Sequence, residues 1–188
     1  ITPLISGPSY PSANLLLPGD DYHVLSFETP AVPASERAEA TRWRVKDMVD
    51  YPIEDACVDC IVVPAPNGEG EGNHSWAVVA PRARVRDWMQ RAKQARIELD
   101  SIDIPEMALR NLLVMEPTPN ACALLRLSST GGALIVAWRG ELCTFRRFDD
   151  LNIAHFETAD IIGRQALIER LALEIQRTAD AFERQFYG

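Results

Sequence analysis

The chain has 188 residues, of which 47% are hydrophobic and 24% charged, so it can bury the core of one domain or of two small lobes. Its net charge of −8 argues against broad nucleic-acid binding and against adsorption to an anionic membrane, because both depend on Lys and Arg neutralising phosphate groups. No run approaches the roughly 20 apolar residues that cross a bilayer, and no signal-peptide pattern opens the chain. Since the chain begins with Ile1 and stops at Gly188 directly after a helical stretch, we expect sequence to be missing from both ends.

The first fifty residues predict a loop, two strands and a helix. Residues 3–11 are rich in Pro, Ser and Gly and are expected to form a loop, with short strands at 14–17 and 22–28. A helix is predicted over 33–50, because four apolar residues recur there at helical spacing and define one face: Ala34, Ala38, Val45 and Met48.

Trp43 lies nearly opposite this apolar face, among acidic residues of the same helix. An aromatic ring in that position leaves apolar area in water, so we expect either a second lobe or another protein to cover it. In the second case Trp43 is a candidate binding anchor, since Trp is enriched among interface hot spots. Three neighbouring residues complete this candidate partner-binding site: Asp47, Asp50 and Tyr51.

The next segment predicts two strands and a basic helix. Strands are expected at 57–64 and 75–80 around a Gly- and Glu-rich loop at 65–73, followed by a helix over 81–96. The helix is predicted to bury one stripe: Val85, Trp88, Met89 and Ala92. Its other side is expected to be either a solvated face or a site for an acidic partner or phosphate, and it is basic: Arg82, Arg84, Arg86, Arg91 and Lys93.

The cysteines favour a reduced, cytosolic protein. Cys57 and Cys60 could form a redox pair or half of a metal site, but their spacing on a strand directs the two side chains to opposite faces. No matching Cys or His pair completes a tetrahedral metal site. The histidines are isolated and are expected to be structural rather than part of a catalytic triad: His23, His74 and His155.

The second half predicts a strand at 98–102, a short helix, a three-stranded meander and a long helix from residue 158. Asp103 and Glu106 form a capping-box-like pair at the start of the short helix. The meander strands are expected at 121–127, 133–137 and 141–148. The long helix is predicted to bury one stripe: Ile161, Ile168, Leu171, Ile175, Phe182 and Phe186. Strands mixed with helices in this order indicate an α/β or α+β fold.

The turn at 128–132, between the first two meander strands, is the one glycine-containing turn that could bind an anion. Backbone amides of such a turn can form an anion nest, but a plain β-hairpin requires the same glycines for its backbone angles. The chain has neither a Walker A sequence nor a G-x-G-x-x-G motif.

Four stretches, taken in order, carry a family resemblance. They are FETP at 27–30 with RWRVKD at 42–47, YPIEDA at 51–56 with VD at 58–59, SIDIPEMALRN at 101–111, and LEIQR at 173–177 through FERQF at 182–186. On these stretches the chain resembles the MshI family, which serves biogenesis of the mannose-sensitive haemagglutinin (MSHA) pilus. It is more distantly similar to PilM of type IV pilus assembly. The third stretch is the most distinctive, and together they extend over most of the chain.

The resemblance implies an actin/FtsA/PilM-like (ribonuclease H-like) fold that is truncated at both ends. Residues 1–30 would then be partial first-lobe strands, 31–80 a small inserted subdomain, and 81–188 a second-lobe region with the meander and the long helix. It also implies a cytoplasmic protein, peripheral to the inner membrane, that serves as a scaffold or adaptor of an MSHA-type pilus assembly machine. The implied partners are the cytoplasmic tail of a PilN-like inner-membrane protein and other platform proteins, and acidic residues suit a basic tail: Asp47, Asp50, Glu54 and Asp55.

The resemblance further implies a degenerate nucleotide cleft. When the chain is aligned on Gly140 and Arg146, Arg126 stands where the PilM pattern has Asp, and Ser128 stands where it has Gly. Arg126 can meet a phosphate but cannot coordinate Mg²⁺. We therefore expect no enzymatic activity and no cofactor, with an actin-like ATPase that binds ATP and Mg²⁺ as the alternative. In that alternative the contact residues are Arg126, Ser128, Ser129, Gly131 and Gly132.

Overall fold

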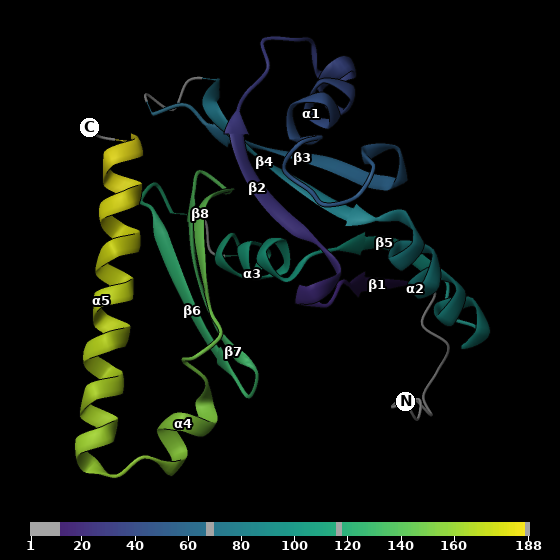
Figure 1. The fold of residues 1–188 in the computed structure, drawn as a ribbon. Coiled ribbons are helices and arrows are strands. Elements are labelled where there is room, and N and C mark those ends of the chain that lie inside the picture. Colours follow the sequence, from purple (N-terminus) through teal and green to yellow (C-terminus); the bar gives the residue numbers. More distant parts are fainter. Residues whose placement is uncertain (1–11, 67–69, 116–117, 187–188) are drawn as a thin grey trace. The chain divides into compact units, whose positions relative to one another are not determined.

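A computed structural model describes residues 12–66, 70–115 and 118–186 (Figure 1). The loop predicted at 3–11 lies outside the described residues, as does part of the loop predicted at 65–73. The chain divides into two compact units, of which the first is Ile1–Val62 with His74–Ala108 and the second Val63–Asn73 with Leu109–Gly188. The division into 1–30, 31–80 and 81–188 has other boundaries and stays a prediction.

Two sheets make up most of the first unit. β1 (Ala13–Leu16) pairs in parallel with β5 (Leu99–Asp103), whereas β2 (His23–Glu28) and β3 (Ala56–Pro64) flank β4 (Glu71–Pro81) in a three-stranded sheet. The five strands predicted for this region are thus confirmed. β4 begins four residues earlier than predicted, at Glu71 rather than Ser75, because the end of the predicted loop joins the ladder.

Helix α1 (Arg37–Val45) covers one face of the β2–β4–β3 sheet (Figure 1). That face has a closed core of six buried residues: Phe27, Val45, Ile53, Ala56, Ala77 and Val79. The helix is shorter than predicted, since a 3-10 turn at Ala34–Glu36 precedes it and it ends at Val45. Of the predicted apolar stripe only Val45 is buried, because Ala34 and Met48 fall outside the helix and Ala38 is exposed.

Alternate residues of the same strands face a second core cluster. It consists of Leu17, Tyr22, Ala80 and Ile104, with Val24 and Val78 packed against it. Helix α2 (Arg82–Gln94) adds Val85 and Trp88, as predicted, whereas Met89 of the predicted stripe is exposed.

The predicted capping box at the start of α3 (Pro105–Leu113) is wrong. The Asp103 carboxylate accepts a 2.8 Å hydrogen bond from the Ile104 backbone N–H, but Glu106 turns into the core, where it is 2% exposed. There the Glu106 carboxylate accepts a 2.6 Å hydrogen bond from the Tyr22 hydroxyl. A long-range partner therefore outweighs the local cap at this position.

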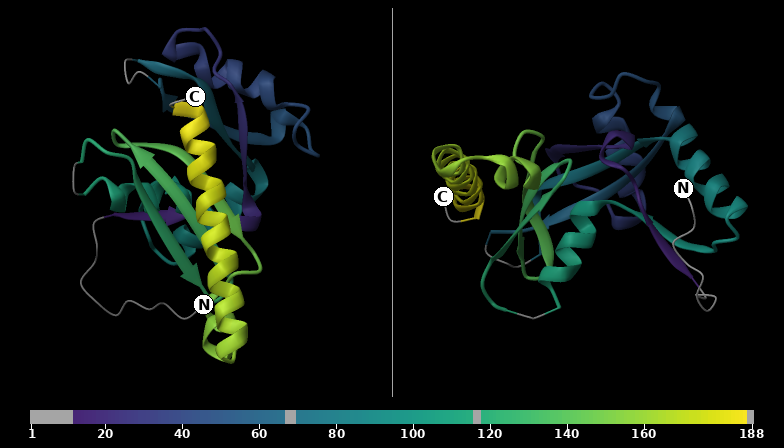
Figure 2. Two further views of the ribbon diagram at one scale, coloured as in Figure 1. Left: turned by 90° about the vertical axis from the view of Figure 1, so that its left-hand side faces the viewer. Right: turned by 90° about the horizontal axis from the view of Figure 1, so that it is seen from below.

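The second unit contains the predicted meander, in which β6 (Cys122–Ser128), β7 (Gly131–Trp138) and β8 (Glu141–Phe148) are antiparallel. After the short helix α4 (Ile153–Thr158), α5 (Ile161–Phe186) runs along one face of this sheet (Figure 2). The core between them contains Leu134, Phe148 and Leu151, with Leu167 and Leu171 of α5 packed against it.

The stripe predicted for α5 is only partly right. Leu171, Phe182 and Phe186 face the sheet, and the Phe186 ring meets Trp138 edge-on at a centroid distance of 5.5 Å. The three isoleucines of the stripe are exposed instead: Ile161, Ile168 and Ile175. Within the described ranges, no helix is long and apolar enough to cross a membrane.

Candidate functional site

The turn between β6 and β7 is closed by a side chain of its own. The Ser128 hydroxyl donates a 2.8 Å hydrogen bond to the Gly131 carbonyl, which closes the hairpin across Ser129 and Thr130. In this conformation the Ser128 hydroxyl is used within the turn. Four of the five predicted nucleotide-contact residues therefore lie together, in an arrangement that a plain hairpin explains.

Packing explains the glycine at position 131 of this turn, and the space around Gly132 is also tight. Gly131 has φ +145°, and a Cβ added to it would lie 2.5 Å from the Phe148 carbonyl oxygen of the neighbouring strand. A Cβ on Gly132 would lie 2.9 Å from Leu127 Cδ2 and 3.0 Å from Phe148 Cδ2. Gly131 thus allows β8 to approach β7, whereas the two side chains beside Gly132 could shift to admit a Cβ. The packing of Gly131 needs no bound phosphate to explain it.

Arg126, the fifth residue, lies on the sheet face that points away from α5. It pairs with Ala133, which pairs with Arg147 on the next strand, so these three side chains share one face. Leu134 and Arg146 belong to the adjacent row and therefore to the face that α5 covers. The backbones of Arg126 and Arg147 are two strand spacings apart, about 10 Å, so this face of the meander carries two guanidinium groups.

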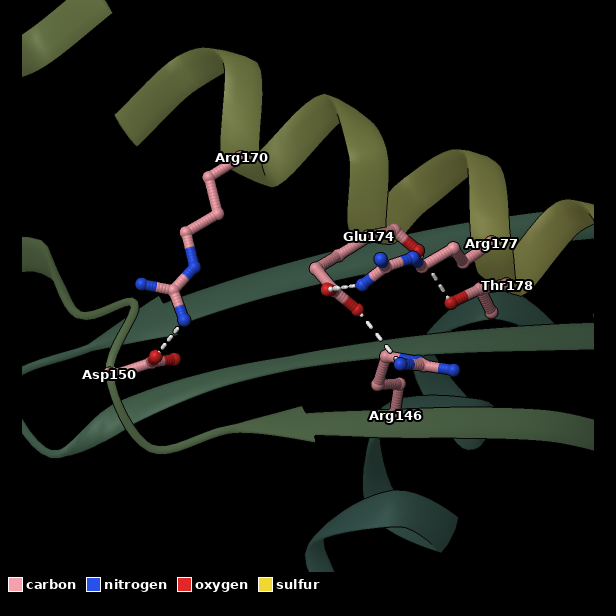
Figure 3. Close-up of polar contacts among 6 residues, drawn as sticks. All are labelled: Arg146, Asp150, Arg170, Glu174, Arg177 and Thr178. Carbon is pink, nitrogen blue, oxygen red and sulfur yellow. Dashed lines mark hydrogen bonds and ion pairs between the residues drawn. The ribbon is translucent and has the colours of Figure 1, made fainter. Parts of the chain in front are cut away.

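Arg146, one of the two residues used to align the family pattern, connects β8 to α5 (Figure 3). Its Nη1 lies 2.9 Å from Glu174 Oε2, and Arg177 Nη1 lies 2.8 Å from the other oxygen of the same carboxylate. A second ion pair joins Arg170 to Asp150, just after β8. These contacts give Arg146 a structural role in holding the helix.

The described residues contain no group of three or more His, Cys, Asp and Glu side chains that could hold a metal ion. The four cysteines are free thiols, with Cys57 and Cys60 half-buried on β3.

Trp43 lies on the exposed side of α1, as the sequence predicts, and its side chain is 60% exposed. Its indole N–H donates a 3.1 Å hydrogen bond to the Glu39 carboxylate, and the Lys46 ammonium lies 5.5 Å from the ring centroid. The ring is therefore held between an acidic and a basic neighbour, with most of its apolar area open to water.

The residues grouped with Trp43 fall into two environments. Asp47 and Asp50 are exposed in the bends after α1. Tyr51 is half-buried against the core cluster around Val45, and its hydroxyl has no hydrogen-bond partner among the described residues. Burial, with a smaller contribution from Asp50, raises the pKa of this hydroxyl. Trp43, Asp47 and Asp50 thus form one exposed segment, and Tyr51 serves as its attachment to the core.

A residue that the sequence did not single out fixes this segment. Arg42, next to Trp43, donates hydrogen bonds of 2.8 Å to the Ile53 carbonyl and 3.2 Å to the Ala56 carbonyl. These bonds anchor the 3-10 turn Ile53–Asp55, which carries the exposed acidic residues Glu54 and Asp55, to the last turn of α1. Nothing in the local pattern distinguishes Arg42 from the other basic residues of the helix.

Cys143 is expected to resist alkylation in the folded protein. Its side chain is fully buried in β8, and this burial raises its pKa to about 12. At pH 8 we expect iodoacetamide to label it about a thousandfold more slowly than an ordinary exposed thiol, because the thiolate is the reactive form. Mass spectrometry of peptides after timed labelling measures this, with Cys122 as the internal comparison. Labelling at equal rates before adding urea would contradict the burial of Cys143.

The sequence matches no protein-family model and no curated protein. Among the solved structures that share its fold are the following two. One is the PilM–PilN type IV pilus biogenesis complex, with a TM-score of 0.66, 18% identity and 92% of this chain covered. The other is the cytoplasmic domain of EpsL, an inner-membrane component of the type II secretion system of Vibrio cholerae, with a TM-score of 0.55, 13% identity and 79% covered.

The match extends over only part of those chains, because this chain spans 58% of the first and 55% of the second. At such identities the likeness is one of fold. The predicted mixed α/β architecture and its similarity to PilM are thereby confirmed, and the cytoplasmic domain of EpsL has the same kind of fold.

Proposed function

We propose that this protein is a cytoplasmic scaffold of an MSHA-type pilus assembly machine, that it is MshI-like, and that it binds the cytoplasmic tail of a PilN-like inner-membrane protein. The likeness in fold to PilM in its complex with PilN supports the proposal, and the likeness to EpsL places the same fold in a related secretion machine. The observation that carries it for this chain is Trp43, a large aromatic side chain left 60% exposed on an otherwise ordered helix.

The surroundings of Trp43 suit a basic peptide that also carries an apolar residue. The exposed carboxylates of Asp47 and Asp50 follow the ring in sequence, and Glu54 and Asp55 are fixed nearby through Arg42. Opposite charge speeds association and selects the register of a bound segment, whereas a buried aromatic anchor supplies most of the affinity. In this proposal Trp43 is the anchor and the carboxylates are the rim.

Replacing Trp43 with Ala is expected to weaken binding of the partner's tail peptide at least tenfold, about 1.4 kcal/mol or more, while leaving the fold intact. Because the ring is mostly exposed, the free energy of unfolding should change by less than about 0.5 kcal/mol. Calorimetric titration gives the affinity and circular dichroism the stability. Unchanged affinity would remove Trp43 from the interface, and unfolding would assign it to the core.

The carboxylates provide a second test of the same site. Reversing Asp47 and Asp50 to Lys should lower the affinity for a basic tail, and the loss should shrink at high salt, because exposed charges are screened. Reversing Asp180 and Glu183 on α5 together to Lys is the matched control, since both are also exposed but lie in the other unit. An equal loss in the control would attribute the effect to net charge rather than to a site.

The same proposal includes an actin-like fold for the whole protein and a cytoplasmic location peripheral to the inner membrane. It also includes the absence of catalysis. This part rests on an arginine, Arg126, where the resemblance has an acidic residue, and on a turn glycine, Gly131, that packing alone explains. A nucleotide-binding ATPase is the alternative, in which Arg126 and the turn residues Ser128, Ser129, Gly131 and Gly132 would contact the phosphates.

We expect no magnesium-dependent ATP hydrolysis. Phosphate release measured with Mg-ATP should equal that of a buffer blank, because no carboxylate at position 126 is available to orient the metal. Turnover that disappears in Arg126→Ala would establish the ATPase instead.

A further inference from the structure

The cations of helix α2 and its C-terminal end fall into two groups. Arg82 donates hydrogen bonds to the Glu54 and Ala56 carbonyls, Arg84 lies 3.6 Å from Asp21, and Arg91 stacks on the Trp88 ring. The remaining three side chains make no ion pair or hydrogen bond within the described residues: Arg86, Lys93 and Arg96. Three of these six cations are therefore used internally, and the other three have no polar partner in the part of the chain that the structure describes.

The unpartnered cations lie beside exposed apolar side chains. Arg86, Met89 and Lys93 follow one another at helical spacing on a single face, and Ile97 comes one turn later. Met89 is 53% exposed and Ile97 45% exposed. They border an open surface hollow of about 930 Å³ whose lining also includes Lys93, Arg96, Glu98 and Leu99.

Arg96 occupies a backbone position that favours glycine. The Ile97 N–H bonds to the Ala92 carbonyl and the Arg96 N–H to the Lys93 carbonyl, which is the Schellman arrangement that ends a helix. In it the residue after the C-cap takes a left-handed conformation, and Arg96 has φ 58°. Its Cβ crowds the backbone there, as a glycine would not. The chain thus tolerates local strain at an arginine whose guanidinium makes no hydrogen bond or ion pair with the described residues.

The helix that presents these groups is firmly fixed. Trp88 donates a 2.6 Å hydrogen bond from its indole N–H to the Asp21 carboxylate, and Val85 packs into the core cluster around Tyr22. Because the backbone is held, binding to this surface would cost little ordering of the protein itself.

We propose that Arg86, Met89, Lys93, Arg96 and Ile97 form a docking surface for an acidic peptide segment with apolar side chains, belonging to a partner protein. Two cations, Lys93 and Arg96, line the hollow with a single carboxylate among the described residues, that of Glu98, and Arg86 lies on the same helix face as Lys93. On a protein whose net charge is −8, this locally positive surface favours an acidic ligand. The exposed Met89 and Ile97 require apolar contacts that a phosphate backbone does not supply. The surface lacks the aromatic platforms of single-strand nucleic-acid sites, and the negative charge of the whole protein opposes an anionic membrane.

The proposal does not depend on the Trp43 site, and fluorescence anisotropy tests it. The probe is a labelled synthetic peptide of about twelve residues in which Glu alternates with Leu, compared with a Glu–Ser peptide and a Lys–Leu peptide. Reversing Arg86, Lys93 and Arg96 together to Glu should lower the affinity for the Glu–Leu peptide at least about tenfold. Reversing Arg184, an exposed arginine on α5, to Glu should leave that affinity unchanged. Replacing Met89 and Ile97 with Ser should lower the affinity for the Glu–Leu peptide more than the affinity for the Glu–Ser peptide.

Arg96→Gly separates binding from folding. Glycine fits the left-handed position better, so the midpoint of urea unfolding should rise while affinity for the Glu–Leu peptide falls about threefold or more. The proposal is overturned if the Glu–Leu peptide does not bind, or if the triple reversal leaves its binding unchanged. It is also overturned if single-stranded DNA or phosphatidylserine vesicles bind this surface more tightly than the peptide and lose binding in the triple variant, because the surface would then belong to another class of ligand.

Discussion

Gly131→Ala is expected to destabilise the β6–β7–β8 unit by at least about 3 kcal/mol, because it combines backbone strain with a steric clash. The clash is with the Phe148 carbonyl oxygen, 2.5 Å from the new Cβ, and a backbone atom of the adjacent strand cannot rotate away as a side chain can. The φ of +145° is itself unfavourable for alanine. Urea unfolding followed by circular dichroism measures the change as a lower midpoint.

Gly140→Ala is the matched control for this substitution. Gly140 also has a positive φ, +84°, but the nearest atom to a Cβ there is Val114 Cγ1 at 4.0 Å. Alanine should therefore cost only the backbone strain, about 1 kcal/mol. Equal losses at the two positions would mean that the approach of β8 to Gly131 is not as tight as the structure has it.

The same pair of variants bears on the nucleotide alternative. A glycine kept for phosphate contact would tolerate alanine in the unliganded protein and lose only nucleotide affinity. A glycine kept for packing loses stability with no nucleotide present. The 2.5 Å distance from the Gly131 Cβ position to the Phe148 carbonyl oxygen favours the second outcome, so a glycine turn between two strands need not indicate a nucleotide site.

The strands could be predicted from the sequence because their signals are local. β7 is a continuous apolar run buried along its whole length, and a tight Arg139–Gly140 turn separates it from β8. The left-handed φ of both turn residues, 54° and 84°, agrees with that prediction. Such turns fix the meander without reference to distant parts of the chain.

The buried faces of the helices could not be predicted as well, because periodicity identifies a stripe without identifying its neighbour. α5 carries two apolar series, one through Leu167 and Leu171 and another through Ile161 and Ile168, and only the first meets the sheet. The sheet selects the series that also brings Glu174 within reach of Arg146, a contact between residues 28 positions apart. Helical spacing alone does not contain that information.

The candidate sites show the same division. The place of Trp43 opposite Val45 on α1 followed from helical spacing, a local property, although the rest of the predicted apolar face is exposed. The Arg42 bonds that fix its neighbours, the burial of Tyr51 and the strain at Arg96 depend on chain segments or backbone angles that the sequence does not specify. The side-chain arrangement of the candidate sites was thus least predictable where contacts between distant chain segments determine it.

Tyr22→Phe is expected to lower the free energy of unfolding by about 1.5 to 3 kcal/mol, which is the range for a hydrogen bond to a charged group. The hydroxyl bonds at 2.6 Å to a Glu106 carboxylate that is 2% exposed, and the two residues are 84 positions apart. Removing the donor leaves the carboxylate buried with one partner fewer, so the penalty is that of desolvation without compensation. Urea unfolding measures it, and a double-mutant cycle with Glu106→Gln isolates the pairwise contribution.

Tyr51→Phe makes the same chemical change where the opposite sign is expected. The Tyr51 hydroxyl is buried with no hydrogen-bond partner among the described residues, so its removal should leave stability unchanged or raise it by about 1 kcal/mol. Comparing Tyr22→Phe with Tyr51→Phe separates the loss of a hydrogen bond from any general effect of removing a tyrosine hydroxyl in this unit. Equal destabilisation of both variants would mean that the Tyr22–Glu106 hydrogen bond does not hold α3 to the core. The inward position of the Glu106 side chain would then need another explanation.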